Sequence, residues 1–315
     1  MVKLIKIYNN LNLKKKHKGS IILIGNFDGV HQGHQKLFNL AKKFKKKFNL
    51  NIGVLTFEPM PKMFFNKKIK NFRISNFDQK IDLLKNLDVD FIINKKFDNK
   101  FSKIKSSSFI KEIIYKKLNA KFIFVSNNFR FGNKREGDVS QLINYEIEYG
   151  YKIIKPEPLK IKDKVASSSL IRNFLEEGFL DKANKLLKRN WCVVGKVEKG
   201  RQVGKKIGFP TCNIDIKDYV LAKPGVYAVM VYKKNSKSPI KGIANLGYRP
   251  TFNQKKLLLE VHLFNFSGNL YNKYLSVEFL RFIRKEKKFK NVDQLRKQIK
   301  SDLLIAKNTQ WTNFK

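Results

Sequence analysis

Short apolar runs alternate with amphipathic stretches through the first half of the chain. Five of these runs are rich in Ile, Val, Leu and Phe, which is typical of buried strands. The predicted strands are residues 20–25, 51–57, 91–94, 121–126 and 151–155. Residues 35–48, 77–86 and 106–118 carry apolar side chains at helical spacing. This order predicts an α/β domain with a parallel sheet and helices on both of its faces.

The pattern changes near residue 190. Residues 169–177 and 180–187 form two short helical stretches that close the first domain. Short β-rich runs separated by Gly, Pro and Asn follow, which predicts an antiparallel sheet or a small barrel. These runs are residues 191–198, 225–232, 241–246, 256–264 and 274–282, and an amphipathic helix at 291–304 ends the pattern. We therefore predict two domains, residues 1–185 and 186–315.

The net charge of +42 at pH 7 is the most unusual feature of the composition. It is what a nucleic-acid-binding protein would show. However, only ten of the 67 Lys and Arg residues are Arg, which is the better reader of phosphates and base edges. The lysines are spread along the whole chain, which favours solvated surface lysines over a nucleic-acid-binding stripe. The same field would attract a small anionic substrate.

No apolar run approaches the ~20 residues that cross a bilayer. The N-terminal stretch lacks the continuous apolar segment of a secretory signal. The chain has two cysteines, Cys192 and Cys212, which form neither a disulfide framework nor a zinc pattern. We expect a reduced, cytoplasmic protein with no membrane partner.

The stretch GNFDGVHQGH at residues 25–34 follows a predicted strand and opens a helix. The N-terminus of a helix offers free N–H groups and a positive dipole end to phosphate. His31 and His34 lie three residues apart at this point, so both can face one bound phosphate. Imidazole donors there would stabilise the charge that builds on the α-phosphate of ATP as pyrophosphate leaves. We predict nucleotidyl transfer with His31 and His34 as catalytic residues.

This stretch resembles the HxGH signature of bacterial bifunctional riboflavin kinase/FMN adenylyltransferases, also called FAD synthetases. Further blocks match that family in order over about residues 18–305, which is more specific than any single motif. In the first domain these blocks are TFEPMP at 56–61, RISNFDQK at 73–80, NFRFG at 128–132 with Arg135, Gly137 and Asp138, and SSSLIR at 167–172. The resemblance implies a Rossmann-like nucleotidyltransferase domain followed by a small antiparallel β-barrel kinase domain with a C-terminal helix.

The second-domain blocks have the same order as in the family. They are GFPTCN at 208–213, PGVYA at 224–228, NLGYRPTF at 245–252, LEVHLF at 259–264 and FIRKEKKF at 282–289. By resemblance, Thr211 and Asn213 hold Mg²⁺, and their spacing puts both on one face of a strand. Glu260, an acid in an apolar strand pattern, is by resemblance the general base of the kinase. Arg284, Lys287 and Phe289 are the implied flavin-binding residues.

The resemblance also implies ATP as the co-substrate at both sites. Hydroxyls at the start of a helix, with an Arg nearby, can clamp ATP phosphates. The implied ATP-binding residues are Gly25, Asn26, Phe27, Asp28, Asn128, Arg130, Ser167, Ser168, Ser169, Arg172, Gly200, Lys205 and Gly208. The implied function is ATP-dependent phosphorylation of riboflavin to FMN, followed by adenylyl transfer from ATP to FMN.

Three positions depart from the family pattern. Met60 stands where the family usually has His, Ser126 replaces a Gly, and Asn128 replaces an Asp. These departures support an alternative, a riboflavin kinase whose adenylyltransferase domain is impaired. A basic nucleic-acid-binding protein is the alternative from a different class. It would place aromatic and basic residues together on one sheet face, with no requirement for His31 and His34.

Overall fold

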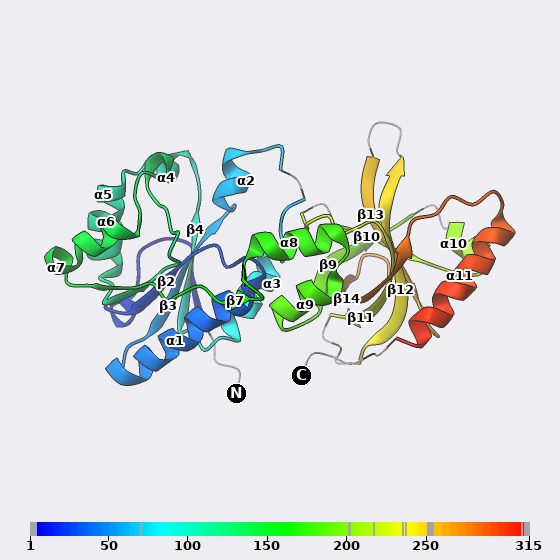
Figure 1. Cartoon of the computed structure of the whole chain (residues 1–315), viewed down its shortest axis with the longest axis horizontal. Coiled ribbons are helices and arrows are strands. Elements are labelled where there is room, and N and C mark those ends of the chain that lie inside the picture. Colours follow the sequence, from blue (N-terminus) through cyan, green and yellow to red (C-terminus); the bar gives the residue numbers. More distant parts are fainter. Residues whose placement is uncertain are drawn as a thin grey trace. The chain divides into compact units, whose positions relative to one another are not determined.

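The computed structural model describes residues 5–69, 71–200, 203–216, 218–234, 236, 238–250, 255–309 and 311. Contacts divide the chain into two compact units (Figure 1). The first unit comprises residues 1–69 and 77–166, and the second comprises residues 70–76 and 167–315. Each unit has its own sheet.

The first unit is built on a six-stranded sheet in the order β1-β4-β3-β2-β5-β6. Its strands are β1 Lys6–Tyr8, β2 Ile21–Ile24, β3 Ile52–Glu58, β4 Phe91–Lys96, β5 Phe122–Phe124 and β6 Lys152–Ile154. Every pairing in this sheet is parallel. The predicted parallel sheet is confirmed, and the short edge strand β1 is an addition to it.

Helices cover both faces of this sheet, as predicted, because alternate residues of each strand point to opposite faces. Ile21 and Leu23 of β2 pack in one core cluster with Phe38 of α1 and Leu84 of α3. Ile22 belongs to the cluster on the other face, which contains the helical segment 109–118. The helical segments of this unit are η1 Lys15–His17, η2 Asp28–Val30, α1 Gln32–Phe48, α2 Pro61–Phe65, α3 Phe77–Lys85, α4 Asn99–Ser102, α5 Ser106–Ser108, η3 Phe109–Leu118, η4 Asn133–Arg135, α6 Val139–Asn144 and α7 Glu146–Tyr149. A two-stranded ribbon, β7 Lys160–Ile161 and β8 Lys164–Val165, completes it.

The strand order reverses at β2, which lies between β3 and β5. In open parallel sheets, ligands bind at the carboxyl ends of the strands at such a switch point. The residues that follow β2 and β5 begin at Gly25 and Val125. The topology therefore places the 25–34 stretch and the 125–132 loop at the same edge of the sheet.

The second unit contains a closed, antiparallel six-stranded barrel in the order β10-β13-β12-β11-β14-β9. Its strands are β9 Trp191–Glu198, β10 Cys212–Asp215, β11 Gly225–Lys233, β12 Ile240–Pro250, β13 Lys255–Leu263 and β14 Tyr274–Lys285. Alternate positions supply fully buried apolar side chains, among them Val193, Ile214, Val231, Leu259, Val261 and Val277. The predicted barrel is confirmed, as is the C-terminal helix, α11 Val292–Lys307. A short helix, α10 Val203–Lys206, precedes β10.

Two helices, α8 Ser168–Glu177 and α9 Leu180–Leu187, belong to the second unit. Helix α9 packs on β9 and β14 of the barrel. Its buried Asn184 donates from Nδ2 to the Phe279 carbonyl (3.0 Å) and accepts at Oδ1 from the Trp191 amide (2.7 Å). The helices that the sequence assigns to the end of the first domain thus help to close the barrel.

A fragment of residues 167–315 is expected to be more stable than a fragment of residues 186–315. The shorter fragment lacks Asn184, so the buried Phe279 carbonyl and Trp191 amide lose their partners, at a cost of about 1–3 kcal/mol for each buried group. Thermal unfolding followed by circular dichroism would measure the difference. Equal unfolding temperatures would show that α9 contributes nothing to barrel stability.

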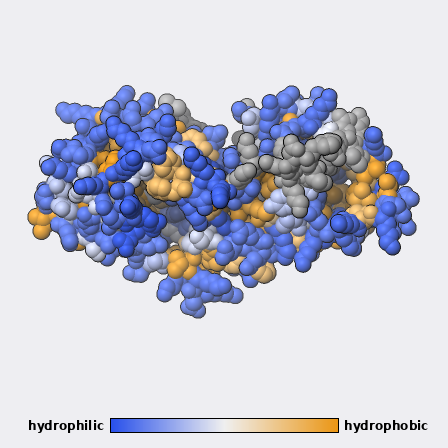
Figure 2. All heavy atoms as spheres, turned by 90° about the horizontal axis from the view of Figure 1, so that it is seen from above, coloured by the Kyte–Doolittle hydropathy of each residue, from blue (hydrophilic) through white to orange (hydrophobic). Residues whose placement is uncertain are grey.

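Hydrophilic residues cover most of the face shown in Figure 2, and apolar residues gather there in small groups. The buried charged residues of the described chain are few: Asp28, Arg73, Lys80, Arg172 and Asp302, with the histidines His17 and His31. Almost all of the described lysines are therefore at least partly solvated, as the scattered lysine pattern predicts. None of the described helices is long and apolar enough to span a membrane.

Candidate active sites

The stretch that follows β2 is a tight loop. Phe27, Gly29 and Val30 all have positive φ angles, of 49°, 75° and 41°. Phe27 and Asp28 are buried, and the Phe27 ring lies against Gly25, where a Cβ would approach it to 3.1 Å. This loop brings the chain to the N-terminus of α1.

His31 caps helix α1 and lies directly beside His34. Their ring centroids are 3.7 Å apart with an interplanar angle of 25°. Nδ1 of His31 accepts a hydrogen bond from the Gly33 amide (3.1 Å), so a neutral His31 ring carries its proton on Nε2. The structure thus brings together the two histidines that the sequence singles out.

Burial, followed by the neighbouring His31, lowers the pKa of His34 well below its usual value, so the His34 ring is neutral at pH 7. Its Nδ1 atom is buried and has no hydrogen-bond partner among the described residues. A buried polar atom without a partner is costly and is typical of a binding site. This nitrogen is therefore placed to meet a polar group of a ligand.

Gly33 allows the close packing around the His31 ring. A Cβ at this position would lie 2.8 Å from the Ala166 carbonyl and 3.0 Å from the His31 ring. Only glycine fits between these two groups without displacing one of them.

Asn128 and Arg130 follow β5 at the same sheet edge. Oγ of Ser126 and Oδ1 of Asn128 are 3.0 Å apart, so two of the residues that depart from the family pattern bond to each other. Arg130 contacts Asp138 across the loop (Nη1–Oδ2 3.4 Å), and both side chains are exposed. The third departure, Met60, is buried at the start of α2.

The serines of the SSSLIR block begin helix α8 in the second unit. Ser167 caps this helix by accepting from the Leu170 amide (3.2 Å). Arg172 is buried, donates from Nε to the Phe72 carbonyl (2.7 Å) and stacks on the Phe72 ring, with Cζ 3.7 Å from its centroid. The structure thus shows Arg172 anchored to the 70–76 segment, and Ser168 and Ser169 in the first turn of α8.

Polar residues form a row across neighbouring strands of the barrel. Asn213 of β10 is paired with Glu260 of β13, which is paired with Asn245 of β12. The row continues through Val226 of β11 to Arg284 of β14. Residues directly opposite each other share a face of a sheet, so these side chains lie on one surface.

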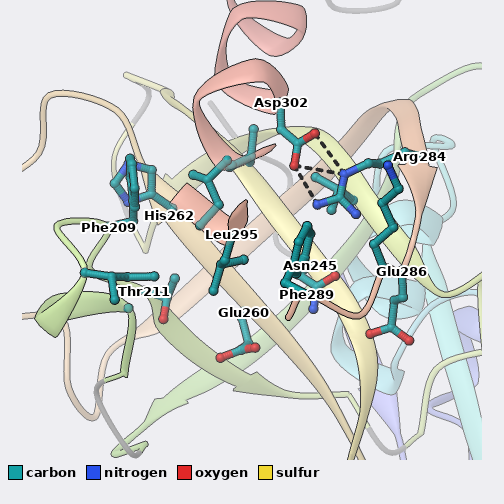
Figure 3. Close-up of a pocket in the computed structure, with 16 residues that line it drawn as sticks. Phe209, Thr211, Asn245, Glu260, His262, Arg284, Glu286, Phe289, Leu295 and Asp302 are labelled. Atoms are coloured by element: carbon teal, nitrogen blue, oxygen red, sulfur yellow. Dashed lines mark hydrogen bonds and ion pairs between the residues drawn. The ribbon is translucent and has the colours of Figure 1, made fainter. Parts of the chain in front are cut away.

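A cavity of about 280 Å³ lies on this surface, between the barrel and helix α11. Five sequence-predicted residues line it: Thr211, Glu260, Arg284, Lys287 and Phe289. In the view of Figure 3, Glu260 lies between Thr211 on one side and Glu286 on the other. Apolar residues such as Val226, Ile243 and Ile299 form other parts of the wall. The mixture of an apolar wall and a few polar groups is typical of a ligand site.

The predicted metal ligands lie at one end of the polar row. Asn213 is buried, and Thr211 lines the cavity two residues earlier. Gly200 lies against the Asn213 side chain, and a Cβ at Gly200 would overlap its amide. A hydroxyl and an amide oxygen are suitable hard ligands for Mg²⁺, so these residues fit the ion that the sequence predicts.

Other predicted ATP-binding positions surround this end. Gly208 has a φ of 87°, and the turn at residues 204–209 is held by a hydrogen bond from the Phe209 amide to the Gly204 carbonyl (2.8 Å). Lys205 is in α10, and its side chain lies outside the described part of the structure.

Arg284 forms a buried ion pair with Asp302 of α11. Its Nη2 and Nε atoms lie 2.7 and 2.9 Å from the Asp302 carboxylate, and the Asp302 side chain is 1% exposed. Gln298 donates a further hydrogen bond to Asp302 (2.9 Å) and is 3.5 Å from Nζ of Lys287. Removing one partner of such a buried pair typically costs 3–5 kcal/mol. The pair ties α11 to the cavity wall (Figure 3).

Four polar residues line the cavity although the sequence analysis gave them no role: Asn245, His262, Glu286 and Asp302. The first three lie inside the matched blocks, so the blocks already contained the signal. Nδ1 of His262 is 2.8 Å from the Pro210 carbonyl, which connects β13 to the predicted metal loop. Asp302 is in the C-terminal helix, where no motif points to it.

A helix N-terminus with paired histidines at a sheet switch point, together with a barrel cavity that holds a carboxylate, defines a nucleotide-dependent transferase with two sites. The family model described as FAD synthetase matches residues 13–170, and the one described as riboflavin kinase matches residues 187–310. The chain belongs to the bifunctional riboflavin kinase/FMN adenylyltransferase family and contains both of its domains.

Curated relatives match the chain over nearly its full length. The bifunctional riboflavin kinase/FMN adenylyltransferase of Buchnera aphidicola subsp. Schizaphis graminum is 40% identical over 299 residues, which are 94% of this chain and 96% of that protein. The protein of the same name from Escherichia coli K12 is 35% identical over 306 residues, 97% of each chain. A solved structure titled as a macrolide-efflux protein from Streptococcus pneumoniae is similar in fold, with a TM-score of 0.84 and 28% identity over 99% of this chain and all of that one.

Proposed function

We propose that this chain makes FAD from riboflavin in two steps, with riboflavin, FMN and ATP as its small-molecule substrates. In the first step, the second domain transfers the γ-phosphoryl group of ATP to riboflavin and releases ADP. In the second step, the first domain transfers AMP from ATP to FMN and releases pyrophosphate. We assign these activities to residues 186–315 and 1–185, and we place the enzyme in the cytoplasm. The observation that carries the proposal is the presence of both sites, the His31–His34 pair and the Glu260 cavity, in one chain.

At the kinase site, Glu260 takes the proton from the riboflavin hydroxyl as the hydroxyl oxygen forms a bond to the γ-phosphorus. The bond between that phosphorus and the bridging oxygen of ADP breaks. Arg284, held by Asp302, and Phe289 provide the flavin side of the cavity, with Lys287 at its rim. Thr211 and Asn213 would hold Mg²⁺, which neutralises charge on the ATP phosphates when bound.

At the adenylyl-transfer site, an oxygen of the FMN phosphate attacks the α-phosphorus of ATP and pyrophosphate leaves. The nucleophile is already an anion, so the site needs no general base. The N-terminus of α1 and the imidazole N–H groups of His31 and His34 stabilise the negative charge that develops on the α-phosphate. The predicted ATP contacts of Gly25 to Asp28, Asn128 and Arg130 come from the loops at this sheet edge.

One assay tests the whole proposal. The pure protein is incubated with riboflavin, ATP and Mg²⁺, and FMN and FAD are separated by chromatography. Both products are expected. FMN without FAD would instead support a kinase with an impaired adenylyltransferase domain, the alternative favoured by the Ser126–Asn128 contact in place of a carboxylate. Neither product would overturn the proposal.

The Gly200→Ala variant is expected to require about tenfold more Mg²⁺ for half-maximal FMN formation. The added methyl group overlaps the Asn213 amide and must displace the predicted metal ligand, and small displacements of a positioned group can cost up to 10²-fold in rate. A Mg²⁺ titration of FMN formation measures the effect, and FAD formation from supplied FMN is the internal control. An unchanged Mg²⁺ requirement would remove Asn213 from the metal site.

A further inference from the structure

Lys80 is the only buried lysine among those that the structure describes, with 2% of its surface exposed. The chain is rich in lysine, and the other described lysines reach solvent. An ammonium group is costly to bury unless charged and polar partners surround it. Lys80 belongs to the RISNFDQK block, yet neither of the two reactions described above uses it.

The surroundings of the Lys80 ammonium are polar on one side. Its Nζ atom donates to Oγ1 of Thr56 (3.2 Å) and lies 3.8 Å from Oε2 of Glu58. Thr56 and Glu58 are two residues apart on β3, so they share a face at the carboxyl end of that strand. Lys80 therefore reaches from α3 to the sheet edge where the substrate site lies.

Thr56 continues the contact toward the signature loop. Its buried hydroxyl accepts from Lys80 and donates to the Asn26 carbonyl at 3.4 Å. Asn26 directly follows Gly25 at the start of the loop that leads to His31 and His34. In a chain of hydrogen bonds, a charged donor at one end strengthens the bonds that follow. The ammonium group of Lys80 thus acts on the loop through Thr56.

We propose that Lys80 is a positioning residue for adenylyl transfer. Through Thr56 it holds the Asn26 carbonyl, and with it the entry of the loop that carries His31 and His34. Glu58 fixes the ammonium group in place. The inference rests on the proposed FMN adenylyltransferase activity and adds a residue on which the geometry of that site depends.

The test compares Lys80→Met, Thr56→Val and the double variant in the full chain. FAD formation from FMN and ATP is measured to separate kcat from the KM for ATP. Each single variant is expected to lower kcat about tenfold and to leave the KM for ATP within about twofold, because a displaced loop harms transition-state contacts more than ground-state binding. The double variant is expected to lose no more than the more impaired single variant, because both changes break the same chain of bonds.

Matched variants separate this role from a general effect on folding. Thr56→Ser keeps the hydroxyl and is expected to recover most of the rate lost in Thr56→Val. Lys85→Met removes a partly exposed lysine from the same helix and should leave FAD formation unchanged. FMN formation from riboflavin should be equal in all variants. If Lys80→Met does not fold, the Thr56→Val and Thr56→Ser pair alone decides the question.

Three results would overturn the inference. They are a Lys80→Met protein with normal kcat, a double variant whose losses multiply, and a Thr56→Ser protein as impaired as Thr56→Val. A wild-type chain that forms FMN but no FAD would overturn the proposed adenylyl transfer itself, and the inference with it. An active wild type with an equally active Lys80→Met protein would remove the inference alone.

Discussion

FAD formation is expected to fall about 10²–10³-fold in His31→Ala and in His34→Ala, while FMN formation from riboflavin continues. The two rings stack 3.7 Å apart at the N-terminus of α1, and each offers an N–H to charge developing on the α-phosphate. Alanine removes that donor and leaves the helix in place. Chromatography of products formed from supplied FMN and ATP measures the loss.

The kinase reaction in the same preparation is the control, because Glu260 and its cavity belong to the other unit. Conservative His34→Gln, which keeps a side-chain N–H donor, should retain more activity than His34→Ala. Loss of both activities in a folded variant would show that the assignment of the two reactions to the two domains is wrong. Undiminished FAD formation would remove the histidines from adenylyl transfer.

Much of the first unit could be predicted from local patterns. The apolar run of β2 and the amphipathic pattern of α1 identify strand and helix without any distant contact. The stretch between them is predictable because glycines and histidines are concentrated there. The segment at 106–118 shows a limit of this approach. Its helical spacing was read correctly, but most of it adopts the wider π conformation, which periodicity over so few turns does not distinguish.

The barrel site depends on contacts that no local pattern contains. Asn213, Glu260 and Asn245 become neighbours only because β10, β13 and β12 are adjacent, in a register that joins residues almost 50 positions apart. Asp302 meets Arg284 across 18 residues, from a helix whose sequence predicts only an amphipathic face. Lys80 is similar, because a buried lysine has no distinguishing mark in a lysine-rich chain.

The role of Glu260 can be tested by a change that preserves its shape. Its position between Asn213 and Asn245 in the strand register places it on the same surface as the predicted metal ligand and, two strands further on, Arg284. A carboxylate there can accept a proton from a hydroxyl bound between the phosphate end and the flavin end of the cavity. Glutamine fits the same space and keeps hydrogen-bonding capacity, but it cannot accept that proton.

Glu260→Gln is therefore expected to abolish FMN formation and to leave ATP binding largely intact. A positioned general base contributes typically 10²–10⁴-fold to rate, so the residual activity should lie at or below about 1% of wild type. Adenylylation of supplied FMN should persist, because the FMN phosphate is already an anion and its reaction takes place at the His31–His34 site. The decisive comparison is FMN formed from riboflavin against FAD formed from added FMN, both in the Glu260→Gln protein, with ATP affinity measured by titration. FMN formation near the wild-type rate would show that another residue accepts the proton, and His262, which also lines the cavity, would be the next candidate to replace.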